Sequence, residues 1–597
     1  MRIVTDKGKQ VIQQIDEIPR FFYPVTGSLL ALVNCETAFN EFSSHVRRDL
    51  ESALSGYIIN ANGVLRKYHS TLYALDILEH ADDLARERLR IIRSLHDKPA
   101  SNFTAGLIGE AILDARRSAH GEQGSYAAAV ANCCRQLLDR LPWSIVGEDL
   151  KQLKASIELQ NEAVYDSMVR TQIEPAAIRA GGISQEVAQL LIQIRFNITM
   201  VLPVRAELSS ALGHHLALNA VENRDIWTDR SLILSDDELL TPVVIGVWDS
   251  GVDIIVFRGQ LATSNGRCGI AWDLDGRPSP YLLYPLTMAQ RLRYIEIRSI
   301  LRGYLDMQAA RETEDAHHLK SRISSLRPED VRPFLEDLTL ISNYIHGTHV
   351  AGIALCGNPA ARLLVSRITW DHSIITKTPS EDVLRAQVAA YQETVKFFSQ
   401  GNTRIVNISW NRSYAIYDHD FDTDSSNTST ERKKRARALF EMDQRGLHEA
   451  ISSHPEILFV VAAGNSNRNA SFNRDFPSCF SLPNLLCVGG AGRDGSDVSF
   501  GSFGPQVTVC ANSVDVDSLV PGDDIMALSG TSMAAPHVTN IAAKLVALRP
   551  SLSPIEIIRL IRDGANVSTD GQRHLVNPRK CYSLLMQSQS CPKQPCS

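Results

Sequence analysis

The sequence lacks the features that mark exported, membrane-spanning or nucleic-acid-binding proteins. Its first residues are polar and carry no apolar secretory run, and the apolar stretch at 27–35 is too short to span a membrane. The net charge is only -6 and both signs are mixed, so nothing indicates binding to nucleic acid. We therefore expect no membrane span, no nucleic-acid partner and a cytoplasmic location; export by a non-classical route is the alternative.

Cysteine is scarce, and its placement does not indicate a disulfide framework. The chain has 11 cysteines, an odd number, and the adjacent Cys133 and Cys134 cannot form an ordinary disulfide with each other. Buried free thiols in a reducing compartment are the simplest account, although Cys591 and Cys596 could close a small loop in an exported protein. No zinc-ligand or calcium-loop spacing is recognisable. We expect no metal and no required cofactor, and leave structural calcium open.

What the chain does contain is enough apolar sequence for more than one core. It has 597 residues, 44% of them hydrophobic, and this length suggests about two to four domains. From about residue 236, strand-like apolar segments alternate with helical stretches, which is typical of an α/β parallel sheet with helices on both faces. We expect strands at 243–248, 269–274, 362–368, 405–410, 458–465, 485–489 and 507–510, and helices at 346–355, 381–399, 432–453, 532–548 and 554–564.

Three motifs place a polar residue where a strand ends or a helix begins, the edge at which α/β sheets present their chemistry. Val-Ile-Gly-Val-Trp-Asp-Ser-Gly-Val-Asp contains Asp249, His-Gly-Thr-His-Val-Ala-Gly begins with His346, and Gly-Thr-Ser-Met-Ala-Ala-Pro-His-Val contains Ser532. Taken singly, an Asp after a strand is more often a turn or helix cap, and a Gly-Thr-Ser segment is more often a helix start whose hydroxyl caps the backbone amides. Together they supply a serine nucleophile, Ser532, a histidine that removes its proton, His346, and a carboxylate that orients the histidine, Asp249.

These motifs resemble those of the subtilisin-like serine proteases, or subtilases, over about residues 236–580. The chain order Asp, His, Ser is also the order in subtilisin. The resemblance implies a subtilisin-like fold and a serine endopeptidase that cleaves protein or peptide substrates through an acyl-enzyme. It further implies that Asn465, at the end of Leu-Phe-Val-Val-Ala-Ala-Gly-Asn, is the oxyanion donor. A catalytically silent binding scaffold and an esterase with the same triad are the rival interpretations.

The resemblance also implies which segments bind substrate. Ile405–Asn411 matches the position at which subtilases pair a Ser-Leu-Gly edge with an extended substrate. Trp410 and Asn411 replace the small or apolar residues of that edge, so the cleavage specificity does not follow. A second departure is Val-Cys-Ala-Asn at 509–512 in place of Ala-Pro-Gly, where we expect a changed loop. The implied substrate-binding residues are Ser409, Trp410, Asn411, Ala463 and Gly464.

An insertion separates two of the three motifs. Asp249 and His346 are 97 residues apart, against roughly 30 in subtilisin, so ~60 residues have been added. The candidate segment, 277–338, carries apolar residues at helical spacing with arginines among them. Two interpretations remain: a surface decoration whose arginines are solvated, and a lid or docking element near the cleft.

Residues 1–235 resemble no family and are expected to form a mainly α-helical N-terminal domain of unknown role. A helical bundle is predicted, joined near 225–237 to a catalytic domain that spans 236–590. The bundle is expected to dock on the protease domain or on a partner protein, where it inhibits, targets or recruits. Helical periodicity is present at 68–95, 127–141, 150–169, 184–194 and 206–221.

Overall fold

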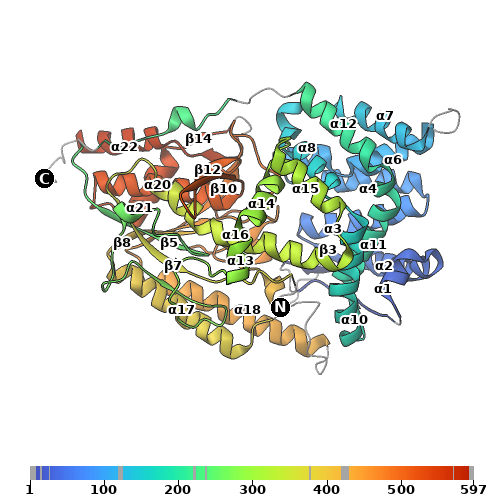
Figure 1. Cartoon of the computed structure of the whole chain (residues 1–597), viewed down its shortest axis with the longest axis horizontal. Helices are drawn as coiled ribbons and strands as arrows, with labels where there is room; N and C mark the ends of the chain where they lie inside the picture. Colours follow the sequence, from blue (N-terminus) through green and yellow to red (C-terminus); the bar gives the residue numbers. More distant parts are fainter. Residues whose placement is uncertain are drawn as a thin grey trace.

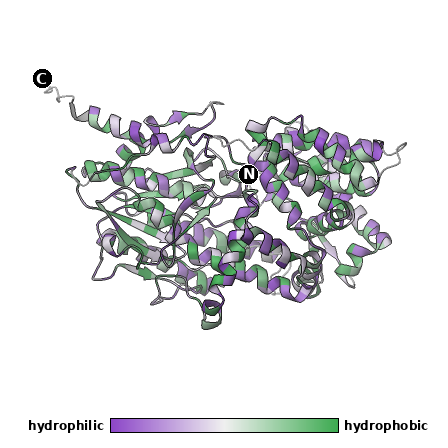
Figure 2. Ribbon diagram, turned by 45° about the horizontal axis from the view of Figure 1, so that its top comes forward, coloured by the Kyte–Doolittle hydropathy of each residue, from purple (hydrophilic) through white to green (hydrophobic). Residues whose placement is uncertain are grey.

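The chain folds into a helical N-terminal part and an α/β C-terminal part that lie side by side (Figure 1). The computed structural model describes residues 9–13, 17–25, 27–118, 125–219, 224–235, 238–374, 378–417, 429–568 and 571–590. Helices in both parts carry hydrophobic and hydrophilic residues together, as expected of elements that bury one side (Figure 2).

A nine-stranded sheet lies at the centre of the C-terminal part. The strand order is β14-β15-β11-β10-β9-β8-β5-β7-β6, and all neighbours pair in parallel except β14 and β15. The expected parallel α/β sheet is therefore confirmed. The strands are β5 Val243–Asp249, β6 Gly269–Ala271, β7 Ala361–Arg367, β8 Thr403–Ile408, β9 Leu458–Ala462, β10 Leu485–Ala491, β11 Val507–Asn512, β14 Asn566–Val567 and β15 His574–Leu575.

Side chains that alternate along the strands build one hydrophobic core on each face of the sheet. In β9, Leu458 and Val460 belong to one core and Phe459 and Val461 to the other. Because helices cover both faces, the strands can be apolar throughout. The face that carries Leu458 and Val460 is covered by α16 Pro328–Leu355, α20 Thr531–Leu548, α21 Pro554–Asp563 and α22 Pro578–Ser590 (Figure 1). The opposite face is covered by α17 Glu381–Gln400 and α18 Ser429–Ser452 (Figure 1).

The inserted segment is helical and is continuous with the helix that carries His346. It forms α13 Met288–Leu292, α14 Tyr294–Gln308, α15 Glu314–Ser324 and the first turns of α16. The prediction that this helix begins at His346 was wrong, because α16 already starts at Pro328 and its buried residues keep helical spacing up to the motif.

Two arginines of the insertion are not merely solvated. Arg298 and Arg302 both bind the Asp524 carboxylate, at 2.6 and 2.7 Å. Asp524 begins β13 Asp524–Leu528, which pairs with β12 Val516–Val520 in an antiparallel hairpin that packs on α16. These contacts fix α14 to the C-terminal part. The rest of the insertion also contacts the N-terminal part, where Lys154 pairs with Glu312 at 2.9 Å and Asn161 donates to the carbonyl of Ile323 at 2.8 Å.

The N-terminal part has a core of its own, built by helices and two small two-stranded sheets. β1 Gln10–Ile12 pairs with β3 Tyr57–Ile59, and β2 Phe22–Pro24 with β4 Gly182–Ser184. The helices are α1 Leu29–Asn34, α2 Glu36–Gly56, α3 Asn62–Leu78, α4 Asp82–Ser94, α5 Pro99–Thr104, α6 Leu107–Ser118, α7 Tyr126–Leu138, α8 Trp143–Glu158, α9 Glu162–Ser167, α10 Glu174–Ala180, α11 Gln185–Phe196 and α12 Arg205–Leu218.

Two of the expected helical stretches are interrupted. The stretch 68–95 is divided between α3 and α4 at His80, whose φ is +60°. The stretch 150–169 breaks after α8, where the Asn161 side chain caps α9. By length and composition alone the helical run 185–218 could cross a membrane, and half of its apolar window is buried inside the protein.

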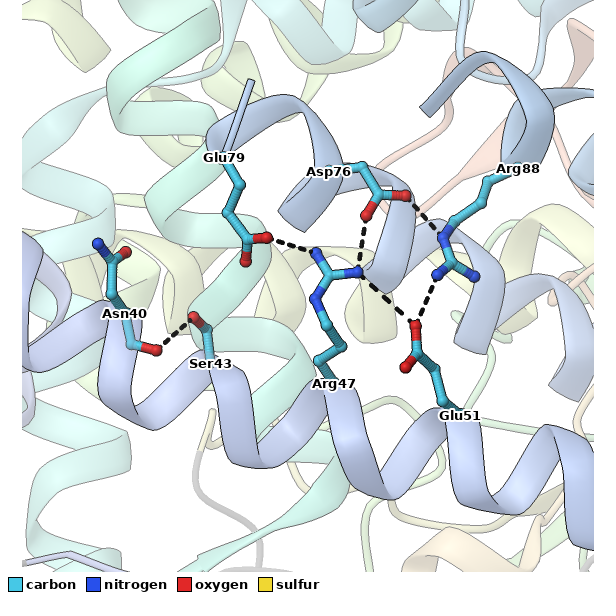
Figure 3. A network of polar contacts seen from close by, with 7 residues as sticks. All are labelled: Asn40, Ser43, Arg47, Glu51, Asp76, Glu79 and Arg88. Atoms are coloured by element: carbon cyan, nitrogen blue, oxygen red, sulfur yellow. Dashed lines mark hydrogen bonds and ion pairs between the residues drawn. The ribbon is translucent and has the colours of Figure 1, made fainter. Parts of the chain in front are cut away.

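A buried ion-pair network joins three helices of the N-terminal part (Figure 3). Asp76 of α3 has no solvent exposure and accepts from Arg47 of α2 at 2.7 Å and Arg88 of α4 at 2.6 Å. Glu79 and Glu51 complete the network on its exposed side, bound to Arg47 and Arg88 respectively. The carboxylate of Asp76 is thereby paired on both oxygens, which offsets the cost of burying it.

Candidate active site

Asp249 and His346 meet at the carboxyl edge of the sheet. Asp249 is the last residue of β5, is fully buried, and accepts a hydrogen bond from His346 Nδ1 at 2.7 Å. The two segments approach closely because a glycine follows His346: a Cβ on Gly347 would lie 2.3 Å from the carbonyl oxygen of Gly251. The bond places a proton on Nδ1, which leaves Nε2 of the neutral ring as an acceptor.

Ser532 lies in the first turn of α20 and is tied to the end of β8. Its hydroxyl donates to the main-chain carbonyl of Ser409 at 3.0 Å, and the Ser409 hydroxyl donates to the carbonyl of Ser532 at 2.9 Å. β8 is the neighbour of β5, with Ile408 opposite Trp248. Ser409, which follows β8, and Asp249, the last residue of β5, therefore lie at adjacent strand ends. No hydrogen bond between Ser532 and His346 is present among the described residues, and such contacts commonly tighten only when substrate binds.

Asn465 stands beside the start of the same helix. Its Oδ1 accepts from the main-chain N–H and from the hydroxyl of Thr531, both at 2.9 Å. These two bonds leave the Nδ2 amide as the group that can donate to a ligand. A side chain at residue 530 would crowd it, since a Cβ on Gly530 would lie 3.0 Å from Asn465 Nδ2, and the φ of +149° also favours glycine there.

The predicted substrate-binding side chains mostly point into the protein. Trp410 is 5% exposed, donates from Nε1 to the carbonyl of Trp248 at 3.0 Å, and stacks on Tyr391. Asn411 donates to the carbonyl of Ala462 at 2.8 Å, which ties the segment after β8 to the end of β9. A substrate contact at 409–411 would therefore have to use main-chain groups, and that role stays a prediction.

Ala463 and Gly464, the other two predicted substrate-binding residues, are held by the main chain around them. Ala463 is fully buried, and its N–H donates to Val488 of β10 at 2.9 Å. The N–H of Gly464 donates to the Thr531 hydroxyl at 3.1 Å, and its carbonyl accepts from Ser502 at 2.7 Å. These bonds position the segment that precedes Asn465 but leave little of it for a substrate, so its binding role also stays a prediction.

One of the two further histidines of the motifs has the contacts of a structural residue. His349, three residues after His346, is fully buried and donates from Nε2 to the carbonyls of Val516 and Met526, at 2.9 and 3.0 Å. Burial lowers the pKa of His349 to about 3 and that of His537 to about 4, so both rings are neutral at physiological pH.

Two residues beside the site were missed by sequence reasoning. Trp370 packs edge-on against the His346 ring, with centroids 5.5 Å apart. Arg367 is buried directly opposite Asp249 in the β5–β7 register, where burial lowers its pKa. Both follow from the position of β7 next to β5, which the sequence order of the strands does not reveal.

Nothing in the described part of the chain groups three or more His, Cys, Asp or Glu side chains in a way that could hold a metal ion. Cys133 and Cys134 are buried free thiols, as expected, whereas Cys35 and Cys356 are exposed. Cys591 and Cys596 lie outside the described residues.

The segment 509–512, expected as a changed loop, forms the end of β11.

Comparisons with known proteins find relatives of the C-terminal part. The family model for the subtilase family matches residues 241–579. A thermostable alkaline protease of Halalkalibacterium halodurans is 35% identical over 109 residues, which are 18% of this chain and 29% of that protein. Subtilisin-like protease 1 of Trichophyton rubrum is 38% identical over 110 residues, 18% of this chain and 21% of that protein. The chain thus spans less than a third of either relative.

Two solved structures are also similar to part of this chain. A cold-adapted subtilisin-like serine proteinase covers 60% of this chain and 97% of its own, with 19% identity and a TM-score of 0.33. The A-subunit of the AB5 toxin from E. coli covers 58% of this chain and 93% of its own, with 17% identity and a TM-score of 0.36. Because the family model matches more than half of the sequence, the chain belongs to the subtilase family.

Proposed function

We propose that this chain is a serine endopeptidase that hydrolyses peptide bonds in protein or peptide substrates through an acyl-enzyme on Ser532. The observation that carries the proposal is the 2.7 Å hydrogen bond from His346 to the buried Asp249, at the sheet edge where Ser532 and Asn465 also lie. This bond holds the imidazole in the tautomer that can accept the serine proton, and stabilises the imidazolium that results.

The proposed reaction has two halves. Ser532 Oγ attacks the carbonyl carbon of the scissile bond while its proton passes to His346 Nε2, and the oxyanion that forms accepts a hydrogen bond from Asn465 Nδ2. The imidazolium then gives its proton to the leaving amine, and water hydrolyses the acyl ester by the same route. Since Ser532 donates to the Ser409 carbonyl at rest, its hydroxyl has to rotate toward His346 before attack. No step requires a metal or cofactor.

Digestion of fluorescent casein, compared with hydrolysis of a chromogenic ester, tests this proposal. The wild type should cleave casein, and Ser532→Ala and His346→Ala should both abolish cleavage, because the triad acts as a unit and its losses do not add. Ser583→Ala, at an exposed serine of α22, is the matched control and should retain full activity. Ester hydrolysis without casein cleavage would favour the esterase, and a folded protein inactive on both would favour the silent scaffold.

A further inference from the structure

A lysine of the N-terminal part is buried against a loop of the C-terminal part. Lys98 precedes α5, and its side chain is 8% exposed. Its ammonium donates to the main-chain carbonyls of Val498 and Gly501, the latter at 2.5 Å, and lies 3.7 Å from the Asp497 carboxylate. Lys98 thus contacts three residues of loop 497–502, although about 400 residues separate it from them in the chain.

The burial of this charge indicates that the contact is specific. Transfer of an ammonium group from water is costly unless acceptors replace the water, and here the loop carbonyls and Asp497 do so. Burial is the main influence on the Lys98 pKa and lowers it, while Asp497 and Asp149 oppose that change. An apolar side chain would fill the same space without the cost, but it could not hold the carbonyls in place.

The loop that Lys98 holds leads directly to the residues on both sides of Asn465. Ser502 follows Gly501, and its N–H donates to the carbonyl of Gly464 at 2.7 Å. The Ser502 hydroxyl accepts from the N–H of Ser466 at 3.3 Å. One serine therefore fixes the main chain immediately before and immediately after Asn465.

A second contact reinforces the first at the next residues. The N–H of Asn467 donates to the carbonyl of Phe500 at 2.8 Å, and Arg66 of α3 donates to the carbonyl of Asn467 at 3.5 Å. The N-terminal part therefore donates from two cations to the two loops that frame Asn465. Without the N-terminal part, the carbonyls of Val498 and Gly501 would lose the Lys98 donor, and the carbonyl of Asn467 would lose the Arg66 donor.

We propose that Lys98 is a positioning residue, which holds loop 497–502 so that Ser502 keeps the Asn465 carboxamide where the oxyanion forms. The helical N-terminal part is then an activator of the protease part. This inference rests on the proposed peptidase function and assigns the N-terminal part a role in it. Because Lys98 acts through Asn465, its loss affects transition-state stabilisation and leaves substrate binding almost unchanged.

Steady-state kinetics of the full chain test the inference with a peptide substrate. Lys98→Met should lower kcat about 10- to 100-fold with KM changed less than about twofold, since a displacement near 1 Å of a catalytic group costs about this much. Lys98→Arg should recover part of the loss. Combining Lys98→Met with Asn465→Ala should cost no more than Asn465→Ala alone, because both remove the same donor. Lys151→Met, which breaks only a pair with Glu148 inside α8, is the control and should match the wild type.

Several outcomes would overturn the inference. Wild-type kcat in folded Lys98→Met, a loss confined to KM, or losses that multiply with Asn465→Ala would each do so. If Lys98→Met does not fold, Ser502→Ala replaces it and should lower kcat about tenfold with KM unchanged; an unchanged kcat there refutes the proposed path. An inactive wild type would instead refute the peptidase function itself, so the two failures are distinguishable.

Discussion

His349 should make the protein less stable in mild acid. This residue of α16 is fully buried, and its Nε2 donates to the carbonyls of Val516 and Met526 in the β12–β13 hairpin. Burial lowers its pKa from the ordinary 6.5 to about 3. Between these two values the unfolded chain binds a proton at this site that the folded protein does not, so protons favour unfolding.

The size of the effect follows from the two pKa values. The stability from the neutral His349 ring is fully present above pH 6.5 and is lost progressively as the pH falls toward 3. From pH 6.5 to pH 5 the change is 1.5 units, which corresponds to about 2 kcal/mol of unfolding free energy.

Urea unfolding at pH 7, 6 and 5 measures this loss. It is best done in a Ser532→Ala background, so that self-digestion does not interfere. Between pH 7 and pH 5 the Ser532→Ala protein should lose about 2 kcal/mol more unfolding free energy than the same protein with His349→Gln added, because glutamine does not titrate in this range. Only the difference between the two pH dependences matters, because the substitution also changes the absolute stability. If the unfolding free energies of the two proteins depend equally on pH, the claim that His349 is buried in its neutral form is refuted.

Three other substitutions have defined expectations. Asn465→Ala should lower kcat about 10²- to 10³-fold with little change in KM, because the role proposed for the amide is to bind the developing oxyanion; a loss confined to KM would remove Asn465 from that role. Asp76→Asn should lower the unfolding free energy of the N-terminal part by about 3 kcal/mol or more, since Arg47 and Arg88 lose a buried partner. Glu79→Gln, at the exposed side of the same network, should cost less than about 1 kcal/mol in the same denaturation assay, and equal costs would contradict the assigned burial.

The parallel sheet and the position of the triad candidates could be predicted because their signals are local. Each strand is a short apolar run, and Asp249 ends the run that forms β5. Once the strands are parallel, their carboxyl ends must meet at one edge, and polar residues placed there converge. The hydrogen bond between Asp249 and His346 needs only this edge and a close approach at Gly347.

Features that depend on contacts between distant segments could not be predicted. The burial of Trp410 depends on Trp248 and Tyr391, which belong to a neighbouring strand and to the helix that covers it. Lys98 is an ordinary lysine in the sequence, and its acceptors lie about 400 residues away. The continuity of α16 was missed because the motif at His346 was taken as a helix start, although the preceding residues are equally helical in spacing.

The central claim is that Ser532 is a nucleophile activated by His346, and covalent labelling tests it most directly. Incubation with a fluorophosphonate, followed by intact mass and peptide mapping, should show one adduct, on Ser532. The adduct should be absent in Ser532→Ala and form far more slowly in His346→Ala, because the hydroxyl then has no base to take its proton. A folded wild type that stays unlabelled, or an adduct on another serine, would contradict the account.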